Sequence, residues 1–213
     1  TNLAANVTNS GASFSYKDAD SVDITTVDSQ MGIATNAGAI TVNAISGTIT
    51  VSKPITSTTG AGGGVSITGS VVINTALTAA GGTITLNGNP NGAFDLDINA
   101  DISASNTINL TAPRDILVGA KLETTGVGAD IILTADSETT PDGIGGVRIE
   151  LLGSLIAIDL VTLTGSDLFD TTGLVGTPVD SVRVDADGTN NQIQSAGTTT
   201  LQSGGSAPAG ADI

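Results

Sequence analysis

Apolar and polar residues alternate in short segments along most of the chain. Ile84 and Leu86 flank a threonine, and Ile108 and Leu110 flank an asparagine. A period of two places alternate side chains on opposite faces of a β-strand, so that one face is buried and the other is exposed to water. No segment shows the spacing of an amphipathic helix, and Thr, Val, Ile and Gly favour strands and tight corners over helices. The pattern predicts an all-β fold.

Nearly the same strand is repeated many times along the chain. Related segments are GAITVNA at 38–44, GGTITLNG at 81–88, NTINLTA at 106–112 and ADIILTA at 129–135. Leu86, Leu110 and Leu133 recur at intervals of about 23 residues, which is typical of structural repeats. We therefore expect repeat units that stack on one another.

Self-similar strands favour a right-handed parallel β-helix, which is a solenoid. Each coil would return one strand spacing above the previous coil, so that Ile stacks on Ile and Thr on Thr. About nine or ten coils at roughly 4.8 Å each would form a rod of roughly 45 Å. An antiparallel β-sandwich is the alternative, because it also contains many short strands and regular turns. A sandwich has no need of self-similar strands, however.

Two segments depart from the repeat. Residues 1–37 match it poorly and are predicted to form an irregular first coil or cap, whereas residues 38–213 form the repeat region. Within that region, residues 165–181 are predicted to be a loop insertion, and such loops often bind partners. The simpler interpretation is that the apolar residues of this loop cover a neighbouring coil. The candidate partner-binding residues are Leu168, Phe169, Leu174 and Val175.

Composition narrows the functions that the chain can have. Aromatic residues make up 2% of it, so the core must be built from stacked layers of Ile, Val, Leu and Ala. The 21 acidic residues against six Lys and Arg give a formal net charge of −15, which argues against binding to nucleic acids and to anionic membrane surfaces. The most apolar stretch, residues 151–161, is too short to insert into a membrane as a helix.

The chain contains no cysteine and no histidine. Disulfides, thiolate metal ligands and thiol nucleophiles are thereby excluded, and the commonest general base is missing. Lys17, Lys53 and Lys121 do not lie in any recognisable catalytic motif. We therefore expect no enzymatic activity, with a β-helical polysaccharide lyase as a further alternative.

Aspartates are the candidate metal ligands. Asp95 and Asp97 alternate on one strand, and an outward pair of this kind, joined by Asp101, is suited to Ca²⁺. A second group surrounds Gly188 as in half of a calcium loop, but no bidentate Glu follows it. Both groups are equally explained as a polar strand face and a turn. The candidate ligands are Asp95, Asp97, Asp101, Asp185, Asp187 and Asn190.

Longer stretches of the chain resemble the β-strand repeats of large bacterial surface proteins of the filamentous haemagglutinin and adhesin type. The resemblance is carried by INLTAPRDILVGAKLETTGVGADIILTADS at 108–137 and VTLTGSDLF at 161–169, and it covers about residues 38–205. NPNG at 89–92 is similar to a turn in the secretion domains of that family, and it also fits a type I turn. The resemblance implies export, a secreted or cell-surface location and a β-helical shaft. It brings no catalytic residues.

The sequence thus predicts a non-enzymatic segment of an exported repeat protein, acting as an adhesin shaft or an extracellular filament building block. A calcium- or glycan-binding module is the alternative, with calcium as the possible cofactor and a host or matrix glycan as the possible partner. Open coils at both ends would expose unpaired strand edges. We therefore expect head-to-tail self-association or continuation in a longer chain. The first residues lack the features of a signal peptide, so we interpret the chain as a processed piece.

Overall fold

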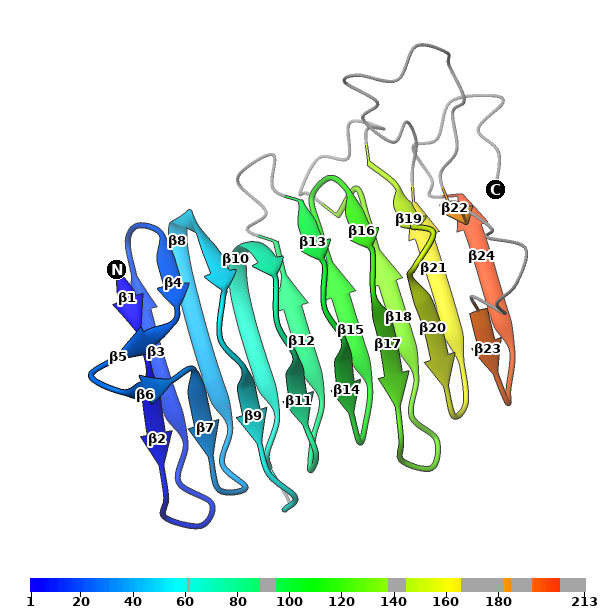
Figure 1. The fold of residues 1–213 in the computed structure, drawn as a ribbon. Coiled ribbons are helices and arrows are strands. Elements are labelled where there is room, and N and C mark those ends of the chain that lie inside the picture. Colours follow the sequence, from blue (N-terminus) through cyan, green and yellow to red (C-terminus); the bar gives the residue numbers. More distant parts are fainter. Residues whose placement is uncertain (61, 89–94, 138–144, 166–181, 185–192, 204–213) are drawn as a thin grey trace.

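The strands of this protein stack side by side into an elongated body (Figure 1). The computed structural model describes residues 1–60, 62–88, 95–137, 145–165, 182–184 and 193–203. These residues form strands and turns and no α-helix, so none of them belongs to a helix that could span a membrane. The prediction of an all-β fold is confirmed for this part of the chain.

Three ladders of parallel strands make up the body. The first ladder contains β1 (Asn2–Leu3), β4 (Val22–Ile24), the ends of β8 (Ile40–Val51) and β10 (Val65–Ile73), β13 (Leu96–Ile98), β16 (Ile116–Val118), β19 (Val147–Ile149) and β22 (Val182–Val184). The second contains β2 (Ala5–Val7), β7 (Ile33–Thr35), β9 (Ile55–Ser57), β11 (Leu77–Ala79), β14 (Ile102–Ala104), β17 (Lys121–Thr124), β20 (Ser154–Ala157) and β23 (Ile193–Ser195). The third contains β3 (Phe14–Asp18), the beginnings of β8 and β10, β12 (Ile84–Asn87), β15 (Ile108–Thr111), β18 (Ile131–Thr134), β21 (Val161–Gly165) and β24 (Thr199–Ser203).

The chain visits the first, second and third ladder in turn and then begins again one strand further along. Strands β8 and β10 each continue from the third ladder into the first, which joins these two ladders into one 14-stranded sheet. Pairings between the described strands are parallel except in the hairpin of β5 (Thr26–Val27) and β6 (Gln30–Met31). This pattern does not fit an antiparallel sandwich. It is consistent with a β-solenoid.

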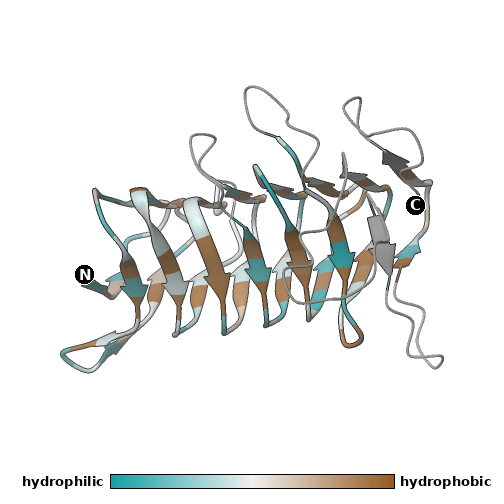
Figure 2. Ribbon diagram, turned by 90° about the horizontal axis from the view of Figure 1, so that it is seen from above, coloured by the Kyte–Doolittle hydropathy of each residue, from teal (hydrophilic) through white to brown (hydrophobic). Residues whose placement is uncertain are grey.

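Aliphatic columns run through the interior because equivalent residues of successive coils lie in direct register. Leu86 pairs with Leu110 and Leu110 with Leu133, and all three are fully buried. The repeat interval predicted from these leucines is therefore confirmed. Figure 2 shows hydrophobic residues at matching places in neighbouring strands. A neighbouring column consists of Ile40, Val65, Ile84, Ile108, Ile131 and Val161.

The second ladder carries a column of small residues at its end, where the chain turns toward the third ladder. The column contains Thr35, Ser57, Ala79, Ala104, Thr124 and Ala157. Its hydroxyl groups are buried and bonded to the backbone of the turn, since Thr35 Oγ1 donates to the carbonyl of Gly38 at 2.6 Å and Thr124 Oγ1 donates to that of Ala129 at 3.0 Å. Small side chains leave room for the sharp turn. The bonds to the turn backbone give the buried hydroxyl groups their hydrogen-bond partners.

Residues 1–37 contain β1 to β7, and β1, β2 and β3 pair in parallel with strands of the following coil. The β5–β6 hairpin departs from this pattern and projects at the start of the stack (Figure 1). Its turn has φ of 46° at Asp28 and 71° at Ser29, as in a type I′ hairpin. Of the insertion predicted at 165–181, Gly165 ends β21 and the other residues lie outside the described part.

Candidate functional site

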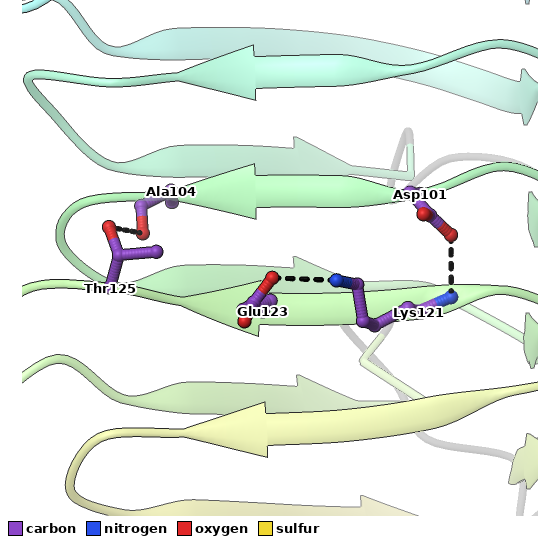
Figure 3. A network of polar contacts seen from close by, with 5 residues as sticks. All are labelled: Asp101, Ala104, Lys121, Glu123 and Thr125. Carbon is purple, nitrogen blue, oxygen red and sulfur yellow. Dashed lines mark hydrogen bonds and ion pairs between the residues drawn. The ribbon is translucent and has the colours of Figure 1, made fainter.

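Two of the predicted calcium ligands bind the backbone of the next coil. Asp95 stands directly before β13, and its Oδ1 accepts a hydrogen bond from the N–H of Asp115, which stands directly before β16, at 3.2 Å. Asp101 stands before β14, and its Oδ1 accepts from the N–H of Lys121 at 3.1 Å (Figure 3). These carboxylates therefore join neighbouring coils.

Asp97 lies in β13 between two buried residues and faces outward. The described residues contain no group of three acidic side chains close enough to hold a metal ion. Asp185, Asp187 and Asn190 lie outside the described residues, as do the predicted partner-binding residues Leu168, Phe169, Leu174 and Val175. Calcium binding at the predicted residues stays a prediction.

The contact made by Asp95 and Asp101 recurs along the stack. In each case the residue directly before a strand accepts the N–H of the residue at the equivalent position in the next coil. That residue stands directly before the paired strand or, for Thr48 and Lys121, within it. Further pairs are Ser13 with Ala39, Ser21 with Thr48, Asp115 with Gly146 and Asp130 with Leu160, at 2.9 to 3.2 Å. The ladder begins one residue later, so this N–H would otherwise lack a partner. The side chain therefore caps the strand as an N-cap residue caps a helix.

Replacing one of these capping residues is expected to destabilise the stack. Asp130→Ala removes the acceptor of the half-buried Leu160 N–H and should lower the free energy of unfolding by about 1–3 kcal/mol. Asp130→Asn keeps a side-chain oxygen and should lose less. Urea denaturation of the three proteins measures both effects. Equal stability of Asp130→Ala and the unmodified protein would show that the contact is energetically neutral.

An ion pair lies on the outward side of the second ladder (Figure 3). Lys121 Nζ is 2.7 Å from Glu123 Oε2, and this hydrogen bond raises the pKa of Lys121, with burial acting in the opposite direction. In the next turn, Thr125 Oγ1 donates to the carbonyl of Ala104 at 3.4 Å. The side chains of the pair are 39% and 34% exposed, so solvent screens the attraction. The pair contributes to local order on this face and little to stability.

Asp18, at the end of β3, accepts several hydrogen bonds in the first coil. Bonds from Thr1, from the Tyr16 hydroxyl at 2.8 Å and from the N–H of Asp20 lower the pKa of Asp18 to about 2. A carboxylate with a lowered pKa stabilises the folded state above its ordinary pKa, and this contribution disappears as the pH falls through the lowered pKa.

We expect the stability difference between the protein and its Asp18→Asn variant to shrink as the pH falls from about 4 to about 2. Thermal unfolding of both proteins across this range measures the difference. A constant difference would mean that the hydrogen bonds to Asp18 do not lower its pKa.

A shallow cleft lies beside β19 on the outward side of the first ladder. It encloses about 330 Å³ and is lined by Gly119, Arg148, Glu150, Leu151 and Leu152. Leu151 and Leu152 are 54% and 81% exposed. A Cβ atom at Gly119 would lie 3.0 Å from Glu150 Oε2, so glycine gives this carboxylate its room. Charged groups beside exposed aliphatic side chains suit a ligand with hydroxyl groups and an apolar face, such as a sugar.

The sequence showed no signal for this cleft. Arg148 lies in β19 and Glu150 directly follows that strand, but Gly119 comes from the preceding coil. The two leucines belong to the most apolar stretch of the chain, residues 151–161. Comparison of the chain with models of protein families, with curated proteins and with solved structures found no match.

Proposed function

We propose that this chain is a non-enzymatic shaft segment of an exported surface protein, folded as a right-handed parallel β-helix. The observation that carries the proposal is the fixed order of the three ladders. In the described part of the chain, eight successive coils each supply one strand to each ladder. Right-handed connections between parallel strands of one sheet are strongly preferred, which supports the handedness.

A stack of this kind suits a spacer. Each coil contacts only its neighbours, so length grows with the number of coils while the cross-section stays constant. Eight coils at about 4.8 Å span roughly 40 Å. The net charge of −15 supports solubility of a protein made almost entirely of strands. Export and a cell-surface location rest on the resemblance to the repeats of large bacterial adhesins.

The same geometry supports head-to-tail association as part of this proposal. Strands β1, β2 and β3 of the first coil are paired on one side only within the described residues. Partly buried apolar residues, Leu3, Phe14 and Tyr16, continue the interior columns to this edge. Inside the protein, each coil pairs its strand edges with those of the next coil. The exposed edge of the first coil is therefore suited to pair with the last coil of another molecule.

Two measurements test the proposal. Small-angle X-ray scattering of the purified chain should give the profile of a rod, and electron microscopy should show short rods or end-to-end fibres. A compact, isometric particle would contradict the shaft. Antibodies raised against the chain should label intact cells of the organism that produces it. Labelling only after lysis would contradict the exported location while leaving the fold untouched.

A further inference from the structure

Two successive turns stack at the corner between the third and first ladders. In the lower turn the chain passes Arg114 and Asp115 before entering β16. In the upper turn it leaves β18 toward Asp136 and returns through Gly145 and Gly146 to β19. The N–H of Asp136 donates to the Arg114 carbonyl at 3.3 Å, and the N–H of Gly146 donates to Asp115 Oδ1 at 2.9 Å. These contacts place two aspartates at one corner.

Both aspartates are buried, at 4% exposure for Asp115 and 5% for Asp136. Both carboxylate oxygens of Asp136 are inaccessible to solvent and accept no hydrogen bond. The backbone of Asp136 has a φ of 52°, in the left-handed region, so the turn holds it in an uncommon conformation. A buried carboxylate without a partner is costly, because the group has lost its hydration and gained nothing in return. A nearby positive charge would offset this cost.

We propose that this corner binds a calcium ion through the carboxylates of Asp136 and Asp115. Calcium accepts carboxylate and carbonyl oxygens in irregular geometry, as a turn of the chain supplies them. Two carboxylates match its charge, and the acidic surface of the protein raises the local concentration of cations. The two proposed ligands differ from the predicted ligands Asp95, Asp97 and Asp101, although Asp95 lies next to the site through its contact with the Asp115 N–H. The proposal does not depend on the proposed function.

Arg114 is the competing source of positive charge at this corner. Its Nε is also buried. A guanidinium group that neutralised Asp136 would make the carboxylate important for stability with or without calcium. The two explanations therefore differ in whether the contribution of Asp136 depends on the ion.

Thermal unfolding in calcium chloride and in EGTA tests the site. At a hundredfold excess of calcium over its dissociation constant, the melting temperature should rise by about 5–10 °C. Asp136→Asn should abolish this rise, and the control variant Asp28→Asn, which alters an exposed acid in the β5–β6 hairpin turn, should keep it. No rise in the unmodified protein, or an equal rise in Asp136→Asn, would overturn the proposal.

Calorimetric titration with calcium chloride provides a second readout that does not require Asp136→Asn to fold. The Asp28→Asn variant should bind calcium with the affinity of the unmodified protein. Asp115→Asn should weaken binding at least tenfold, because it removes one of the two charged ligands. Absence of binding in the unmodified protein, or unchanged affinity in Asp115→Asn, would overturn the site.

Discussion

Replacing Leu110 by alanine is expected to lower the free energy of unfolding by about 2–5 kcal/mol. Leu110 is fully buried in β15, and it stacks between Leu86 of the previous coil and Leu133 of the next. Truncation leaves a cavity in the middle of an aliphatic column, and the backbone hydrogen bonds on both sides prevent the coils from closing around it. Equilibrium denaturation in urea measures the change.

Leu152→Ala is the matched control. This leucine is 81% exposed and lies in the turn after β19, so the same chemical change should alter stability by less than about 0.5 kcal/mol. A comparable loss in both variants would mean that the interior columns are no better packed than the surface. The contrast therefore tests whether the stack is held together by its core.

Gly32→Ala is expected to destabilise the protein by about 1–3 kcal/mol more than Gly128→Ala. Both glycines have a φ in the left-handed region, 63° and 69°, so the backbone strain added by alanine is nearly the same. At Gly32 a Cβ atom would lie 2.0 Å from the carbonyl oxygen of Pro54 in the next coil, whereas at Gly128 nothing lies within 4 Å. The difference isolates the steric effect of coil spacing.

The same Pro54 carbonyl accepts the N–H of Ile33 at 3.1 Å, so a side chain at position 32 must push this backbone contact apart. Urea denaturation of the two alanine variants gives the difference directly. Equal destabilisation would falsify the close approach of the coils at this corner, since strain alone would then account for both substitutions.

The repeat could be predicted from sequence because it depends on local patterns. Alternation reveals which residues of a strand are buried, and the recurrence of Leu86, Leu110 and Leu133 reveals which residues stack. The three-ladder arrangement was harder to predict from the sequence, because the strands of the second ladder are short and separated from the others only by brief turns. Their apolar pairs were visible, but not the sheet to which they belong.

The roles of the aspartates could not be predicted, because they depend on the neighbouring coil. Asp95 and Asp97 look equivalent in sequence, yet one caps the next strand and the other faces outward. The signal for capping was an Asp or Ser directly before the first apolar residue of a strand, as at Asp130 and Ser21. Burial of Asp136 had no such signal, since it arises where two turns stack.

The corner between the third and first ladders has a practical consequence for engineering. The connection from Thr111 to Ile116 is short and that from Thr134 to Val147 is much longer, yet the strands on both sides pair with the same register. Connection length is thus uncoupled from strand pairing at this corner. A foreign epitope grafted between Thr111 and Ile116 would be displayed along one edge of the rod. Its position along the rod axis would be set by the coil that carries it.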